Sequence, residues 1–153
     1  MAVKWNNIYR GGVHRTTAET REVAKTETSP ASVLPGMGVA LSPTAGITKT
    51  VGDETFFYLV GEQLYGSVDE EQTANGSSYR LYSPRSGDLY AGRAAAGITL
   101  VDDLALTIDA AGRFAAAGAE EAVHAYVDMP ASAHPQTEPL TTVVDQLIPI
   151  KIK

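Results

Sequence analysis

The chain contains no cysteine among its 153 residues. Disulfide bonds, thiol nucleophiles and thiolate metal ligands are therefore excluded, and stability must come from packing or assembly. Histidine is also scarce. His14, His124 and His134 are the only three, and no two lie three or four residues apart, so the sequence contains no helix-borne zinc pair. We predict no metal site and no cofactor, and we interpret His124 as a histidine at the edge of the core or at an interface.

Long hydrophobic runs are absent as well. No stretch approaches the roughly 18 consecutive apolar residues that a membrane span requires. The first residues, MAVKWNNIYRGG, lack the apolar core of about 7–15 residues that marks a signal peptide. The sequence therefore predicts a protein made in the cytoplasm that does not associate with a membrane.

The whole chain has a net charge of −6, and positive charge is rare outside its first 28 residues. Residues 1–28 hold five Lys/Arg and three Asp/Glu, a net charge of +2. Residues 29–153 hold seven Lys/Arg and fifteen Asp/Glu, a net charge of −8. Because binding to phosphate needs a concentrated basic patch, we expect no nucleic-acid partner. A mildly basic segment on an acidic body instead indicates two electrostatic faces, one of which could dock on a partner.

Catalytic motifs are missing too. The sequence contains no GxSxG nucleophile elbow, no GxxxxGK[ST] phosphate loop and no GxGxxG dinucleotide loop. Asp102 and Asp103 are adjacent, so on a strand they would point to opposite faces and could not readily work as an acid–base pair. Asp69–Glu71 is a second acidic cluster, but the alternating ligand spacing of a calcium loop is absent. We interpret both clusters as solvated turns and predict that the protein is not an enzyme.

The chain does contain short apolar runs separated by turn residues, above all between Gly97 and Asp128. The runs are Leu104–Ile108, Arg113–Ala116 and Val123–Val127. A turn at Asp109–Gly112, where glycine can adopt positive φ, separates the first two. The pattern favours a β-meander. An alanine-rich helix over about 110–125 is the alternative, which Gly112 and Gly118 disfavour because each would cost about 1 kcal/mol inside a helix.

Further runs extend the β pattern to most of the chain. The expected strands are Val39–Leu41, Thr55–Val60, Tyr79–Tyr82 and the alternating residues Ile148–Ile152. The nearly continuous apolar run TFFYLV predicts a strand buried on both faces. Pro149 and the flanking lysines mark the last strand as an edge strand, or as one covered by another element. Short strands at such intervals predict a mainly β fold, a small β-barrel or sandwich.

The first 29 residues differ from this body in being polar and lacking a sustained period. Ser29–Gly36 contains two prolines and forms the boundary, with Pro35-Gly36 at the central positions of a type II turn. The predicted division is therefore an extended N-terminal arm, 1–29, and a β-rich domain, 30–153. The arm is either a disordered terminus or a segment that becomes ordered on a partner through aromatic anchors.

Two stretches resemble a known family. They are the entry Ser-Pro-Ala-Ser-Val-Leu-Pro-Gly at 29–36 and the pattern Asp103-Leu-Ala-Leu…Gly112-Arg-Phe-Ala-Ala-Ala-Gly118…Ala122-Val-His-Ala125. With the arm and the small β-domain, they resemble the capsid decoration (cement) proteins of tailed bacteriophages, most strongly over Pro30–Val60 and Gly97–Val127. The resemblance implies a β-rich domain on the outer face of the capsid shell, grouped around local symmetry axes. It also implies an N-terminal segment lying on the major capsid protein or on a neighbouring copy, and no catalytic residues.

From this resemblance and the charge distribution we expect a structural virion protein on the outer capsid surface that bridges major capsid protein subunits. The expected partners are the major capsid protein and further copies of the chain, as a trimer or alternatively a dimer. The candidate partner-binding residues are Trp5, Ile8, Tyr9, Arg10, Arg15, Arg21, Pro35 and Gly36. Removing Met1–Thr28 is expected to leave a folded body that no longer binds capsids.

Two other functions remain open. A tail or fibre protein would predict repeats or a coiled coil, and neither is visible in the sequence. A carbohydrate-binding β-module would need aromatic side chains on one exposed face, for which Tyr79, Tyr82 and Tyr90 are the candidates.

Overall fold

The structure is a computed structural model that describes residues 8–11, 20–23, 32–41, 48–61, 72–73, 79–129 and 140–153. Every regular element in these ranges is a β-strand, which confirms the mainly β prediction. No helix in the described ranges has the length and hydrophobicity needed to cross a membrane. Each named pair of neighbouring strands runs antiparallel.

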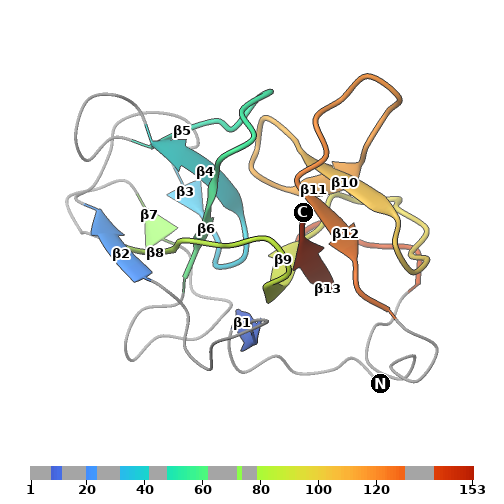
Figure 1. Cartoon of the computed structure of the whole chain (residues 1–153), viewed down its shortest axis with the longest axis horizontal. Helices are drawn as coiled ribbons and strands as arrows, with labels where there is room; N and C mark the ends of the chain where they lie inside the picture. The colour runs from blue at the N-terminus through green and yellow to red at the C-terminus, as the bar shows by residue number, and fades with distance from the viewer. Residues whose placement is uncertain are drawn as a thin grey trace.

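The larger sheet contains six strands in the order β1-β9-β13-β12-β10-β11. Their bounds are Tyr9–Gly11 for β1, Leu89–Arg93 for β9, Ala105–Ile108 for β10, Phe114–Ala116 for β11, Ala125–Val127 for β12 and Leu147–Ile152 for β13. β13 is the longest strand and lies between β9 and β12. The C-terminal end of the chain therefore occupies the middle of this sheet (Figure 1).

The second sheet contains five strands in the order β2-β8-β6-β4-β5. Their bounds are Thr20–Val23 for β2, Gly38–Leu41 for β4, Thr48–Lys49 for β5, Tyr58–Val60 for β6 and Tyr79–Tyr82 for β8. A two-stranded pair, β3 (Ser32–Val33) with β7 (Gln72–Thr73), accompanies it. Figure 1 shows this sheet on one side of the molecule and β10–β13 on the other. Both strand orders are open, so the described strands form no closed barrel.

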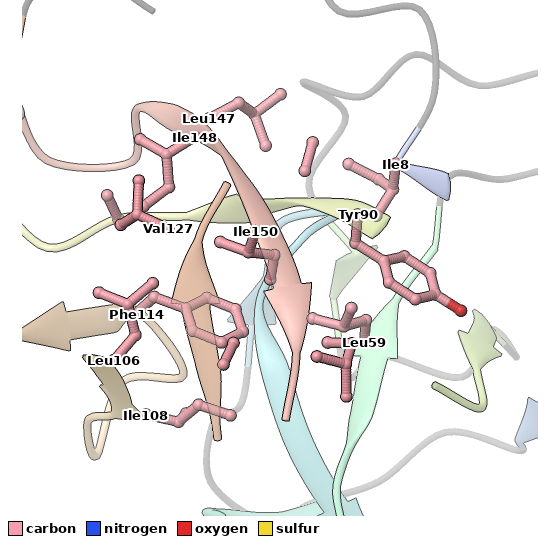
Figure 2. Close-up of a cluster of buried hydrophobic side chains, with 14 of the residues drawn as sticks. Ile8, Leu59, Tyr90, Leu106, Ile108, Phe114, Val127, Leu147, Ile148 and Ile150 are labelled. Atoms are coloured by element: carbon pink, nitrogen blue, oxygen red, sulfur yellow. The ribbon is translucent and has the colours of Figure 1, made fainter. Parts of the chain in front are cut away.

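The main hydrophobic core contains side chains from both sheets (Figure 2). Leu59 of β6 and Ile150 of β13 are fully buried in it, and so is Phe114 of β11. Gly92 of β9 makes this packing feasible, because a Cβ there would lie 2.7 Å from Cδ2 of Phe114. A smaller cluster fills the interior beside β4, with members Val33, Met37, Val39, Val60 and Leu81.

The three strands expected within Gly97–Asp128 are present as β10, β11 and β12, so the helical alternative is wrong. The predicted meander order is also wrong. β12 pairs with β10 rather than with β11. The segment after β11 is too long for a tight hairpin, and it reverses at a turn in which the Glu121 N–H donates to the Gly118 carbonyl. The chain therefore returns on the other side of β10, where β12 also pairs with β13.

Both predicted turns are present. Gly112 has φ +85°, and the Asp109 carboxylate accepts hydrogen bonds from the N–H groups of Ala111 and Arg113, each at 2.9 Å. Gly36 has φ +94°, and the Met37 N–H donates to the Leu34 carbonyl at 3.1 Å, as a type II turn requires.

Two strand predictions need correction. The run Thr55–Val60 forms a strand only at Tyr58–Val60, and Phe56 before it is 59% exposed instead of buried. The strand at the end of the chain is not an edge strand, because β9 and β12 flank it. Pro149 occurs within this central strand, where its carbonyl accepts a hydrogen bond from the N–H of Asp128 at 2.9 Å.

The expected arm also needs correction where the structure describes it. Ile8 is 0% exposed in the main core, and β1 after it pairs with β9. Thr20–Val23 pairs with β8 as an edge strand of the second sheet. These segments belong to the two sheets, and for β1 the apolar side chain of Ile8 enters the core. Deletion of Met1–Thr28 would therefore remove part of the folded body.

Candidate functional site

The predicted partner-binding residues whose side chains the structure describes do not gather on one exposed surface. Trp5 and Arg15 lie outside the described residues, and Arg21 is known only as a backbone position in β2 paired with Leu81. Ile8 is buried, so its side chain serves the core. Tyr9 is half-buried beside Tyr90, with ring centroids 5.2 Å apart.

Arg10 forms an ion pair within the body, with its Nη1 3.2 Å from Oδ2 of Asp128. Pro35 and Gly36 are both buried. Arg93 fixes their turn: its Nε donates to the Pro35 carbonyl at 2.9 Å, and its backbone N–H donates to the Gly36 carbonyl at 2.9 Å. The turn therefore connects the second sheet to β9 of the first.

The aromatic face proposed for carbohydrate binding is not present. Tyr82 and Tyr90 are 5% and 0% exposed, and their ring centroids lie 5.7 Å apart in the interior. The side chain of Tyr79 lies outside the described residues. Two of the three candidates therefore cannot stack on a sugar, and this alternative loses its supporting feature.

The clearest polar feature of the interior is His124, which is 2% exposed just before β12. Its Nε2 lies 2.7 Å from the Glu54 carbonyl oxygen. A carbonyl can only accept, so Nε2 carries the proton and donates. Nδ1 is then a bare acceptor, and it is buried without a hydrogen-bond partner. The rings of Phe57 and His124 are nearly perpendicular, at a centroid distance of 5.4 Å.

A cavity of about 600 Å³ adjoins His124. Its walls are mainly apolar, and its lining includes Phe56, Phe57, Pro84, Arg85, Ile152 and Lys153. Burial lowers the pKa of His124 below the usual 6.5, and the hydrogen bond to Glu54 opposes this shift. A neutral ring against hydrophobic walls, with no carboxylate in the lining, lacks the partner of a general acid–base pair. We interpret His124 as a polar link between the two sheets.

The carboxylates at Asp102 and Asp103 belong to a turn, as the sequence predicted for them. Asp102 Oδ1 accepts a hydrogen bond from the Met129 N–H at 2.8 Å, and Asp103 Oδ1 lies 3.5 Å from Nζ of Lys151. No group of three or more potential metal-ligating side chains occurs within the described ranges. His14, His134 and Asp69–Glu71 fall outside those ranges.

Exposed apolar side chains form a more distinctive feature. Of the five large hydrophobic residues exposed in the described ranges, four belong to segments 97–101 and 140–144, which are joined by a bridge between Thr99 and Thr141. We call this surface the valine strip; its members are Val101, Leu140, Val143 and Val144, which are 45–56% exposed, with Thr99 and Thr141.

Backbone pairing aligns the valine strip. Thr99 and Thr141 form an antiparallel bridge, and the Leu100 N–H donates to the Leu140 carbonyl at 2.8 Å. Buried residues alternate with exposed ones over 97–101, and Thr142 is buried between exposed neighbours, so Ile98, Leu100 and Thr142 face inward. Our sequence reasoning missed this surface, because its two segments lie some 40 residues apart. The adjacent valines at 143 and 144 were the available signal.

No protein-family model matches the sequence, and no curated protein matches it.

Proposed function

We propose that this protein is a structural, non-enzymatic component of a tailed-phage virion. It binds the outer surface of the capsid and stabilises the shell by bridging major capsid protein subunits. Its partners are the major capsid protein and further copies of itself, in a trimer or a dimer. The proposal comes from the family resemblance of Pro30–Val60 and Gly97–Val127 together with the surface described above.

The valine strip is the observation that supports this proposal best. Soluble monomers rarely expose contiguous large apolar groups, and such patches commonly mark protein contacts. The strip begins in the segment that carries the resemblance, since Val101 lies within Gly97–Val127. By contrast, the buried polar residue His124 and the exposed carboxylates of Asp102 and Asp103 show no arrangement for catalysis.

The fold also brings together the two stretches that carry the resemblance. The two stretches of the resemblance contact each other directly, because the Gly38 N–H donates to the Gly112 carbonyl at 2.8 Å. A Cβ at Gly112 would lie 2.9 Å from the Gly38 oxygen, so the backbones are in close approach. Many identical contacts repeated by capsid symmetry would then give high avidity from modest individual interfaces.

Co-sedimentation with decoration-free capsids tests this function. The capsids are assembled from the major capsid protein of the phage that encodes the chain, and the full chain is added in increasing amounts. We expect saturable binding at a fixed ratio of chain to capsid subunit, and a higher melting temperature of the decorated shell. Absence of binding would overturn the proposal. Light scattering of the free chain distinguishes trimer, dimer and monomer.

A further inference from the structure

We propose that the turn Val143–Gln146 is the anchor of the valine strip and that the strip docks on an apolar protein site bordered by lysine or arginine side chains. This inference rests on the proposed function, which places such a site on the outward face of the major capsid protein. It goes further by naming the surface of this chain that makes the contact and the chemistry of the surface that receives it.

The anchor turn has an unusual backbone. Gln146 N–H donates to the Val143 carbonyl at 3.2 Å, which places Val144 and Asp145 at the two central positions. Asp145 has φ +63°, and Asp103, in the turn after Val101, has φ +60°. They are the only described non-glycine residues with positive φ. Such conformations are uncommon for side chains other than Asn and Asp and persist where surrounding contacts fix them.

Four of the hydrogen bonds that fix the anchor turn involve Asp145. Its N–H donates to the Ala94 carbonyl at 2.9 Å, and its own carbonyl accepts Nη1 of Arg93 at 2.8 Å. Its carboxylate accepts Nε and Nη2 of Arg113 at 2.6 and 3.2 Å. The hydrogen bond from Arg113 to this carboxylate raises the pKa of the guanidinium, so Arg113 stays charged. The backbone N–H, the backbone carbonyl and the carboxylate of Asp145 therefore all have hydrogen-bond partners.

These contacts fix the backbone of the turn that carries two exposed valines, Val143 and Val144. Arg93 also fixes the buried Pro35-Gly36 turn, so the anchor turn is connected to both sheets. A side chain presented in a fixed conformation loses little entropy on binding, so more of its contact energy remains as binding free energy. Val143 and Val144, 56% and 55% exposed, meet that description better than Phe56, which lies apart from the strip beside the His124 cavity.

The charge of the strip indicates the nature of its partner. Segments 97–103 and 140–146 contain Asp102, Asp103 and Asp145, and no lysine, arginine or histidine. Arg113 neutralises Asp145, whereas the side chain of Asp103 is 70% exposed and has only a 3.5 Å contact with Lys151. A second copy of a chain with net charge −6 would meet the same negative charge. Charge complementarity therefore favours a partner with cationic groups around an apolar centre.

Binding of variants to decoration-free capsids tests the inference. Val144→Asp places a charge on the anchor, whereas Phe56→Asp makes the same change at an equally exposed position away from the strip. We expect Val144→Asp to weaken binding about tenfold or more, as for removal of an interface anchor, and Phe56→Asp to change it less than about twofold. Circular dichroism and thermal melting check that both variants fold.

The partner's charge is tested with the double variant Asp102→Asn/Asp103→Asn. At position 102, asparagine keeps a side-chain oxygen that can accept the hydrogen bond from the Met129 N–H. At position 103, asparagine tolerates the positive φ. We expect the double variant to bind capsids more weakly than the wild type at about 50 mM salt. We also expect its affinity to fall less than that of the wild type when the salt is raised from about 50 to about 300 mM. Unchanged or tighter binding would contradict a basic partner surface.

The remaining outcomes separate the two proposals. If the wild type binds capsids and Val144→Asp binds equally well, the docking inference fails while the proposed function stands. If the wild type does not bind, both fail. If Val144→Asp instead dissociates a homo-oligomer while capsid binding is unchanged, the occupant of the strip is a second copy, and the assignment to a basic partner is wrong.

Discussion

Nε2 of His124 donates a hydrogen bond to the carbonyl oxygen of Glu54 across 2.7 Å. The two residues are 70 positions apart, and their contact joins the start of β12 to the segment that leads into β6. Because the other ring nitrogen, Nδ1, is buried and unpaired, a second proton on the ring would find no acceptor. The stability of the folded state therefore depends on a neutral ring, whereas the hydrogen bond to Glu54 by itself favours the protonated form.

This dependence predicts loss of stability at mildly acidic pH. The pKa of His124 is lowered in the folded state by burial, so the unfolded chain takes up the proton first as pH falls. The stabilisation is fully present above the unfolded pKa of about 6.5 and is lost as pH falls below it. Urea unfolding at pH 7.5 and pH 5.5 measures this. His124→Gln should flatten the dependence while His134→Gln keeps it; an equally steep dependence in His124→Gln would contradict the assignment.

The burial of Ile8 predicts that the N-terminal residues stabilise the body. Ile8→Ala removes methylene groups from the main core, so we expect a loss of about 2–4 kcal/mol in the free energy of unfolding. The exposed Val101→Ala should change it by less than about 0.5 kcal/mol. Denaturant titration of both variants provides the measurement. A small effect of Ile8→Ala would restore the view of these residues as a separate arm.

The close packing around Gly92 in β9 predicts that a larger residue at this position destabilises the protein. An added Cβ would lie 2.7 Å from Phe114 and 2.9 Å from Ile150, with both neighbours buried. We expect Gly92→Ala to destabilise the protein by about 1–3 kcal/mol, as overpacking of a core does. Gly118→Ala is the matched control, since its nearest new contact is Glu121 Oε2 at 3.4 Å. Equal melting temperatures for the two variants would show that the core accommodates the methyl group.

The contacts and the positive φ of Asp145 predict that two substitutions at this position differ in stability. Asp145→Asn loses the charge but tolerates the positive φ, whereas Asp145→Ala also puts an alanine in a left-handed conformation. Because the ion pair with Arg113 is partly exposed, it contributes about 0.2–1 kcal/mol, and the strained backbone adds about 1 kcal/mol for alanine. Unfolding measurements should therefore rank Asp145→Ala as the less stable variant. The reverse order would contradict our account of the turn.

Local chemistry made some features predictable from the sequence. Pro35-Gly36 and Asp109–Gly112 form their expected turns because the conformations depend on residues within four positions. Strand identity was predictable where apolar residues and turn residues alternate, as in β10 and β11. The order of the strands was not, since the pairing of β12 with β10 depends on a neighbour, β13, that comes some 20 residues later.

The candidate surface was harder to predict for the same reason. Val101 and Val143 lie on adjacent segments only when Thr99 pairs with Thr141, and nothing local to either segment specifies that bridge. Ile8 presents the opposite case. Its polar surroundings suggested an exposed arm, but one apolar side chain that enters the core is enough to bring β1 into the sheet. Burial of this kind depends on the partner strand, β9, and leaves little trace in the sequence.

The central claim is that the chain binds the outer capsid surface through the valine strip. Cryo-electron microscopy of decoration-free capsids saturated with the full chain tests it most directly. We predict ordered density at fixed positions on the outer shell, with Val143 and Val144 facing the major capsid protein and its lysine or arginine side chains near Asp102 and Asp103. Capsids without added density, or bound chains whose valine strip faces solvent, would contradict it.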